Sequence, residues 1–424
     1  MTGRNQRGGA ELPVGRRIAR LRARRGMTQQ IFASRVGRSK SWVDKVERGL
    51  RTLDRLSVIE TVAGVLGVTP EVLLGKGTRR GEPAAAVPEA IARMRAALAS
   101  YHVAEPGDPD WRPPPPLGEI ERQVAYAWTA YRHADHHQVL RMLPDLLGDA
   151  RRAGEAGGAP GAAGAAELLV GAYRLAAQLL VKLGEPSLAW LAADRAMAAA
   201  AGDPRRAALA AVPLAQALRA LGQSRLAMTA ATVAARRLSP PPTVDHPPRH
   251  RALAGTLLVE AALAAATYRD HAAARDLLAH ATRLAEAPAT GPAEPQAARP
   301  AEAHDTDDIG YGPLVVELAR ALVTAELGDA PQAITIHTRA TGQDDWQRLP
   351  AEQRAAHLIG MARVHLDAAD PRAAGRALLT ADRIAPAETR LRPAARTVLT
   401  AVFRDGPAAA DVARLAATLG LTRG

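Results

Sequence analysis

The sequence predicts an all-α protein, and three observations support this fold class. Alanine supplies about a quarter of the 424 residues, and alanine is the best helix former and a poor strand former. Aromatic residues make up only 3% of the chain, so the helices should pack closely through thin side chains. The excess positive charge is confined to residues 1–80, where 15 Arg and 3 Lys face 6 acidic residues. The chain should therefore have a cationic head and an electroneutral body.

The composition also excludes several classes of protein. The chain has no cysteine, which rules out disulfides, Cys-ligated zinc and thiol nucleophiles. No run of about 18 apolar residues predicts a membrane span, and the first residues lack the apolar core of a signal peptide. We therefore expect a cytoplasmic protein that does not bind membranes.

Proline, glycine and charge divide the chain into four parts. We expect a disordered arm over residues 1–12, a DNA-binding domain over 13–75, a linker over 76–118 and a helical repeat domain over 119–424. The linker should hold a short helix over 91–102 and an extended proline-rich spacer. Breaks in the body are expected at 154–164, at 239–248 and at 288–313, the last as a disordered loop.

The head divides into five short helices. They are predicted over residues 14–24, 29–36, 40–48 and 53–66, with a fifth helix that starts at Pro70. Thr28 and Ser39 should cap the second and third helices. Gly37 should form the tight turn between them, since glycine tolerates a left-handed conformation. Two short helices joined by such a turn make a helix-turn-helix.

The run MTQQIFASRVGRSKSWVDKVERG, followed by LSVIETVAGVLGVTPEVLLG, resembles the lambda-repressor-like (XRE) family of DNA-binding domains. The resemblance covers about 60 residues and all five helices. Its marks include Thr28-Gln29 at the start of the second helix, Ala33 at the helix crossing, Gly37, the Glu47-Arg48-Gly49 ending and Leu66-Gly67-Val68. It implies a five-helix DNA-binding head of actinobacterial type.

The resemblance assigns roles to individual residues. It implies that Gln29 holds a phosphate and that the third helix presents Lys40, Ser41, Asp44 and Lys45 to base edges, with Arg48 and Arg51 near the DNA backbone. Trp42 departs from the family pattern, because a small Ser or Thr is common there, and packs either on sugar–phosphate or on the domain itself. The candidate DNA-binding residues are therefore Gln29, Ser39, Lys40, Ser41, Trp42, Asp44, Lys45, Arg48 and Arg51.

Helical spacing agrees with these roles. Lys40, Ser41, Asp44 and Lys45 lie opposite the apolar Val43, so they are exposed when the core forms. Lysine can donate to guanine and aspartate can accept from cytosine in the major groove. One such module reads few base pairs, so we expect a homodimer on an inverted-repeat operator with half-sites about 34 Å apart.

The body shows an internal repeat of alanines. We take Gly184, Gly222, Arg269, Gly328 and Ala369 as anchors; the residues seven before, five after and twelve after each anchor are all alanine. A sixth copy on Ala134 has Ala127 in place but Val139 and Leu146 where alanine is expected. The spacing resembles the tetratricopeptide repeat, in which small residues let paired helices approach closely, and so implies an α-solenoid. A final helix over 408–419 would cap the array.

Such solenoids line a concave groove with the first helix of each pair. By the family pattern the groove-facing residues are Trp128, Tyr131, Arg174, Gln178, Gln216, Arg219, Leu322 and Arg363. Arginines there could hold a carboxylate, and the alternative is that these are ordinary solvated or core-rim residues. Related regulators clamp peptides with asparagines, whereas the one asparagine here, Asn5, lies outside the repeats. A peptide, small-molecule or protein effector and pure dimerisation all stay open.

Other constellations do not predict chemistry. His133, His136 and His137 are expected to form an exposed helix junction rather than a metal site. His337, His357 and His365 are expected to pack. We expect no catalytic residues, no metal, no cofactor and no enzymatic activity.

These observations predict an effector-responsive transcriptional regulator. Its head would bind operator DNA, and its solenoid would dimerise and couple an effector to the spacing of the heads. The alternative is a scaffold tethered to DNA, whose repeats recruit a protein partner without sensing a ligand.

Overall fold

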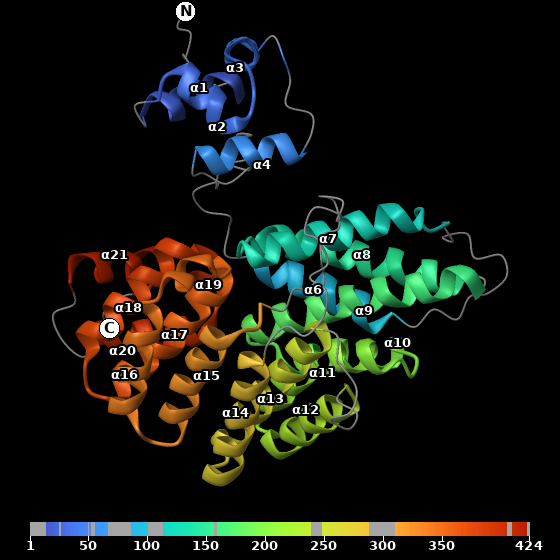
Figure 1. The fold of residues 1–424 in the computed structure, drawn as a ribbon, viewed down its shortest axis with the longest axis vertical. Coiled ribbons are helices and arrows are strands. Elements are labelled where there is room, and N and C mark those ends of the chain that lie inside the picture. The colour runs from blue at the N-terminus through green and yellow to red at the C-terminus, as the bar shows by residue number, and fades with distance from the viewer. Residues whose placement is uncertain are drawn as a thin grey trace, which may run out of the picture. The chain divides into compact units, whose positions relative to one another are not determined.

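The chain forms two compact units, residues 1–89 and 90–424 (Figure 1). The structure is a computed structural model, and it describes residues 14–24, 27–49, 51, 56–66, 86–100, 113–156, 159–238, 248–287, 310–404 and 409–421. All regular elements in these ranges are helical, as predicted. The expected arm over residues 1–12, the fifth head helix and most of the expected loop over 288–313 lie outside the described residues.

Four helices form the described part of the first unit. They are α1 (Val14–Arg24), α2 (Gln29–Val36), α3 (Lys40–Glu47) and α4 (Leu56–Val65). The predicted caps of α2 and α3 are confirmed, because the hydroxyls of Thr28 and Ser39 accept from backbone N–H groups 3.2 Å away. Gly37 ends α2 with a φ of 67°, the left-handed conformation expected of the turn.

Paired helices form the second unit, after α6 (Ala86–Ala99). Six pairs follow one another along the chain: α7 (Leu117–Arg132) with α8 (His136–Ala156), α9 (Ala159–Lys182) with α10 (Pro186–Ala199), α11 (Pro204–Ala220) with α12 (Ser224–Leu238), α13 (Pro248–Thr267) with α14 (His271–Glu286), α15 (Pro313–Glu326) with α16 (Ala330–Thr341), and α17 (Ala351–Asp367) with α18 (Pro371–Ile384). A 3-10 turn, η2 (Asp344–Arg348), precedes α17, and α19 (Pro386–Leu391), α20 (Pro393–Arg404) and α21 (Ala410–Thr418) complete the unit.

The turn within each pair has one backbone geometry. All six anchors are left-handed, with φ between 57° and 102°: Ala134, Gly184, Gly222, Arg269, Gly328 and Ala369. The N–H after each anchor bonds the carbonyl five residues earlier, as between Asp135 and Ala130 at 2.8 Å. This bond satisfies a carbonyl at the end of the first helix. The anchors chosen from the alanine spacing are therefore the residues at which the chain reverses.

The repeated alanines are the contact points between helices. Fourteen of the fifteen predicted alanines have 0% exposed surface, and Ala234 is half-buried. In the first pair Val139 and Leu146 replace alanine and are also buried. The second unit therefore has the tetratricopeptide-like packing that its spacing predicts.

Three boundaries differ from the sequence-based expectations. Residues 154–156 continue α8 and residues 159–164 begin α9, so the break expected over 154–164 was largely wrong. The alanines of this stretch favour helix more than its glycines oppose it. Pro313, expected at the end of a disordered loop, is the first residue of α15, where proline is well tolerated. The linker helix, expected over 91–102, is α6 and starts at Ala86.

One stretch of α9, Ala163–Lys182, is long and apolar enough by composition to cross a membrane. Its most apolar window is 61% buried inside the unit. A core helix of a folded domain passes the same test, and α9 packs against α8, α10 and α11.

Candidate nucleic-acid interface

The second and third helices of the first unit are held together by an apolar core. Phe32 and Ala33 of α2 and Val43 and Val46 of α3 are buried in one cluster, together with Ile18 of α1. Because Val43 and Val46 face this core, the opposite side of α3 faces outward. The core therefore determines which residues of α3 a partner can reach.

The outward side of α3 carries the residues that the sequence assigned to DNA. Lys40, Ser41, Lys45 and Arg48 are exposed, and Asp44 is half-buried. Ser39 is exposed at the start of the helix, and Arg51 is exposed just beyond its end. A helix of this kind fits the major groove, where lysine and hydroxyl side chains can reach base edges.

Asp44 and Arg48 form an ion pair one turn apart on α3. The hydrogen bond from Arg48 holds the pKa of Asp44 below its ordinary value. Asp44 is therefore a carboxylate, and one of its oxygens already accepts from Arg48. The sequence placed these residues in separate roles, whereas the structure joins them.

Trp42 packs partly on the domain itself. The indole is half-buried against the apolar core of the head, and the Arg38 guanidinium lies 5.8 Å from its ring centroid. Sequence reasoning missed Arg38, although its position four residues before a tryptophan is a usable signal. The contact places a cation at the turn between α2 and α3.

Glu47 joins the first three helices through a buried network that sequence reasoning also missed. Arg22 of α1 donates to both carboxylate oxygens, at 2.6 and 3.0 Å, and Gln29 of α2 donates to one at 2.8 Å. The hydrogen bond to Glu47 raises the pKa of Arg22. The Gln29 amide, assigned to a phosphate from the resemblance, thus uses one of its two N–H donors within the domain.

The residues predicted to line an effector groove fall into separate groups. Trp128, Tyr131 and Arg174 are buried: the Trp128 and Tyr131 rings are 5.9 Å apart, edge to face, and Arg174 lies 5.1 Å from the Trp128 centroid. Burial lowers the pKa of Arg174 to about 10. Gln178 and Leu322 are half-buried.

Glu260 brings two further groove residues together. Gln216 donates to this buried glutamate at 2.6 Å, and Arg219 lies 3.4 Å from its other oxygen. Arg363 is exposed and pairs with Glu326. Sequence reasoning missed Glu260, whose carboxylate binds the two side chains that were assigned to an effector.

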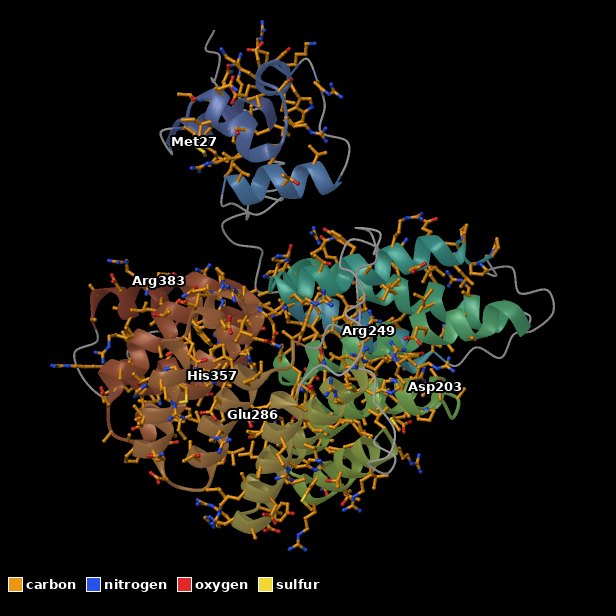
Figure 2. The ribbon with its side chains drawn as sticks, viewed as in Figure 1. Met27, Asp203, Arg249, Glu286, His357 and Arg383 are labelled. Atoms are coloured by element: carbon orange, nitrogen blue, oxygen red, sulfur yellow. The ribbon has the colours of Figure 1, made fainter. Side chains whose placement is uncertain are left out.

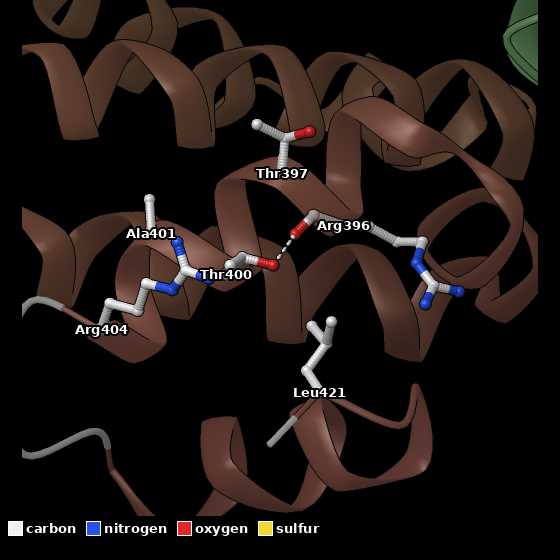
Figure 3. Close-up of a pocket in the computed structure, with 6 residues that line it drawn as sticks. All are labelled: Arg396, Thr397, Thr400, Ala401, Arg404 and Leu421. Atoms are coloured by element: carbon white, nitrogen blue, oxygen red, sulfur yellow. Dashed lines mark hydrogen bonds between the residues drawn. The ribbon is translucent and has the colours of Figure 1, made fainter. Parts of the chain in front are cut away.

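A shallow depression of about 400 Å³ lies elsewhere, along α20 (Figure 3). The Thr400 hydroxyl in it donates to the Arg396 carbonyl at 2.8 Å. Its six lining residues are Arg396, Thr397, Thr400, Ala401, Arg404 and Leu421, and none of them is a predicted groove residue.

Two histidines contact each other between α16 and α17. Nδ1 of His337 lies 3.0 Å from Nε2 of His357. The His357 side chain is buried inside the repeat unit (Figure 2). Burial lowers the pKa of His337 to about 4 and that of His357 to about 3. Within the described ranges, no three histidine, aspartate or glutamate side chains are placed to hold a metal ion.

Comparison with known proteins identifies the first unit. Residues 13–74 match the family model of a helix-turn-helix domain. Among solved structures, the chain is similar to Bacillus thuringiensis PlcR in a crystal structure with the peptide PapR7 and DNA, at 14% identity and a TM-score of 0.31. The similarity covers 65% of this chain and 94% of PlcR. No curated protein matches the chain.

Proposed function

We infer that residues 13–74, which match the family model of a helix-turn-helix domain, are the DNA-binding unit of the chain and precede an all-helical unit of tetratricopeptide-like pairs. We propose that the chain is a sequence-specific transcriptional regulator that binds an inverted-repeat operator in the cytoplasm as a homodimer. In this proposal α3 enters the major groove, and the repeat unit dimerises and senses a peptide, small-molecule or protein effector. The observation that carries it is the outward face of α3, with exposed Lys40, Lys45 and Arg48.

Charge supports α3 as the groove-entering helix. All of the excess positive charge of the chain lies in residues 1–80, and phosphate neutralisation dominates protein–DNA affinity. Arg38 and Arg51 lie just before and just after the helix and are exposed, so they are suited to hold phosphates. Lys40, Ser41, Asp44 and Lys45 are then the candidates for base reading, and Ser39 positions the helix through its cap.

The test compares two double variants of equal charge loss. Operator sequences are first selected from random duplexes with the full chain, and binding is then measured by fluorescence anisotropy over a salt series. We expect Lys40→Ala with Lys45→Ala to lower operator affinity at least tenfold, since each lost base contact costs about 1–3 kcal/mol. The control pair Arg236→Ala with Arg237→Ala removes two exposed cations of α12 and should leave affinity within twofold. Equal affinity of the Lys40/Lys45 variant and the wild type would contradict the docking.

Two further measurements test the finer parts of the proposal. Light scattering of the complex should give two chains per inverted repeat, and one chain per half-site would refute the homodimer. An effector that changes operator affinity supports sensing. A protein partner that joins the DNA complex without changing that affinity would instead support the scaffold.

A further inference from the structure

The array of helix pairs curls back so that its first pairs contact its last ones. Within the second unit, α7 contacts α17 and α8 contacts α19, and the contact with α19 lies at the start of α8, where His136 meets Glu388. A Cβ added to Gly184, the turn of the second pair, would lie 2.8 Å from the Pro393 side chain. The two ends of the array are therefore in close contact.

A buried group of charged side chains forms the centre of this contact; we name it the clasp. Its hub is Glu388 of α19, which has 0% exposed surface. Nε2 of His136 lies 2.6 Å from one Glu388 oxygen, Lys182 donates to the same oxygen at 2.6 Å, and Arg392 donates to the other oxygen at 2.8 Å. Lys182 also bonds Glu352 of α17. His136 and Glu388 are 252 positions apart.

The clasp corrects the expectation for the HADHH segment. His136 was expected at an exposed helix junction, but it has 0% exposed surface because α19 covers the start of α8. Burial of Glu388 favours its neutral form, but the charges of Lys182 and Arg392 and the hydrogen bond with His136 outweigh burial. These partners hold the pKa of Glu388 well below its ordinary value, so the clasp contains a buried carboxylate.

Two kinds of contact hold the array together, and they differ in what separation would expose. Neighbouring helix pairs meet through alanines with no exposed surface, so parting them would expose apolar surface to water. The clasp joins ions, which regain hydration when they separate, and buried ion pairs contribute little net stability because desolvation offsets their attraction. Ala134 of the first pair also lies in the apolar cluster of the last pairs, so parting the two ends would expose some apolar surface. Much less of the chain meets there than between neighbouring helices, and the contact between the ends is therefore the candidate seam at which the array can open.

Three of the predicted groove residues, Tyr131, Trp128 and Arg174, form a chain of contacts that starts at this seam. The Tyr131 ring centroid is 5.2 Å from the Lys182 ammonium and 5.7 Å from the His136 ring. Trp128 contacts Tyr131, and Arg174 stacks on Trp128. Tyr131 and Trp128 are each only 6% exposed while the clasp is formed. Arg174 of α9 covers Trp128, so separation of the clasp would uncover Tyr131 first, whose ring faces Lys182 and His136.

We propose that the repeat domain has a closed and an open form. The contact that breaks between them is the clasp of His136, Lys182, Glu352, Glu388 and Arg392, and its opening exposes the Tyr131 ring. This inference does not depend on DNA binding. It gives the repeat domain a conformational change that an effector can bias, because a ligand shifts such an equilibrium when it binds one form better.

The test measures the distance across the seam. Since the full chain has no cysteine, Ser187→Cys on α10 and Thr397→Cys on α20, both at exposed positions, would be the only sites for nitroxide labels. We expect one short label–label distance in the otherwise unchanged chain. Glu388→Gln keeps the shape of the hub and removes its charge, so a second, longer distance should become the major population.

Glu260→Gln is the matched control. Glu260 is also a buried, hydrogen-bonded glutamate, but it joins α11 to α13 within the array. It should leave the short distance unchanged. If Glu388→Gln loses helical circular dichroism, Arg392→Gln at the rim of the clasp takes its place, since its side chain is 22% exposed. A short distance retained in the folded clasp variants, or a longer one in Glu260→Gln as well, would overturn the proposal.

Discussion

Replacing Glu47 by alanine tests whether the buried network of the head supports its fold rather than its DNA contacts. The change removes the carboxylate to which Arg22 and Gln29 donate. The Arg22 side chain, which is only 15% exposed, then keeps its charge and has lost its ionic partner. Removal of one partner of a buried ion pair costs about 3–5 kcal/mol. We take the lower end, about 3 kcal/mol, because Arg22 retains some contact with water.

This loss has different effects on stability and on binding. In a domain of this size about 3 kcal/mol lowers the midpoint of unfolding by about 12–24 °C. If the head has about 5 kcal/mol of stability, about 2 kcal/mol remains, and about 97% of heads stay folded at 25 °C. Operator affinity should therefore fall less than about twofold at that temperature.

Calorimetry of the full chain measures the first effect, and anisotropy at 25 °C measures the second. Asp44→Ala is the control for stability, because it breaks an ion pair on the same helix that is exposed to water and should cause no measurable shift. A midpoint unchanged by Glu47→Ala would refute the energetic role of the network. Loss of operator affinity from heads that remain folded would show that the network acts on DNA directly.

Three more perturbations have expected outcomes. In urea unfolding, Gly222→Ala should destabilise the repeat unit by about 1 kcal/mol, and Ala369→Gly should stabilise it by up to about 1 kcal/mol. Both positions have a left-handed backbone, which glycine adopts without cost and alanine does not. Equal effects of the same sign would show that backbone conformation does not set these stabilities. Gly15→Ala should unfold the head, since its Cβ would lie 2.2 Å from a carbonyl oxygen of α3, and a native melting curve would rule that contact out. The pKa values of His337 and His357 are about 4 and about 3 in the folded state, against about 6.5 in the unfolded chain. The unfolded chain therefore binds more protons at acid pH, and stability should fall as the pH is lowered from about 6.5 to about 3. Thermal midpoints measured over this pH range should fall less steeply for His357→Phe than for the wild type, and parallel curves would contradict the assignment.

The features that the sequence predicts correctly are local ones. Thr28 and Ser39 cap their helices because a side-chain oxygen reaches an N–H three residues away. The anchors Arg269 and Ala369 are left-handed although neither is glycine. The alanine spacing on both sides identifies the turn, and the backbone hydrogen bonds of that turn determine φ. The exposed face of α3 follows in the same way from the burial of Val43.

The features that the sequence does not predict depend on distant parts of the chain. The bond between Gln29 and Glu47 requires the packing of α2 on α3, and the first helix supplies the balancing charge. His136 is buried because small rotations between successive pairs add up until α19 meets α8. The sequence of a single repeat does not indicate where the last repeat will lie. The position of His136 beside a turn therefore predicts an exposed side chain, although the residue is buried.

Alanine-built pairs have one further consequence for the repeat unit. A methyl group removes little apolar area from water, so each pair contributes less to cohesion than a pair built on leucine would. Solenoids normally rely on terminal helices with a polar outer face to shield their first and last repeats. Here the opening pair is sheltered by the sixth pair and α19. Deletion of an internal repeat would move the sixth pair and α19 away from the first pair, and both ends of the array would then be exposed to water. The fold therefore constrains the number of repeats.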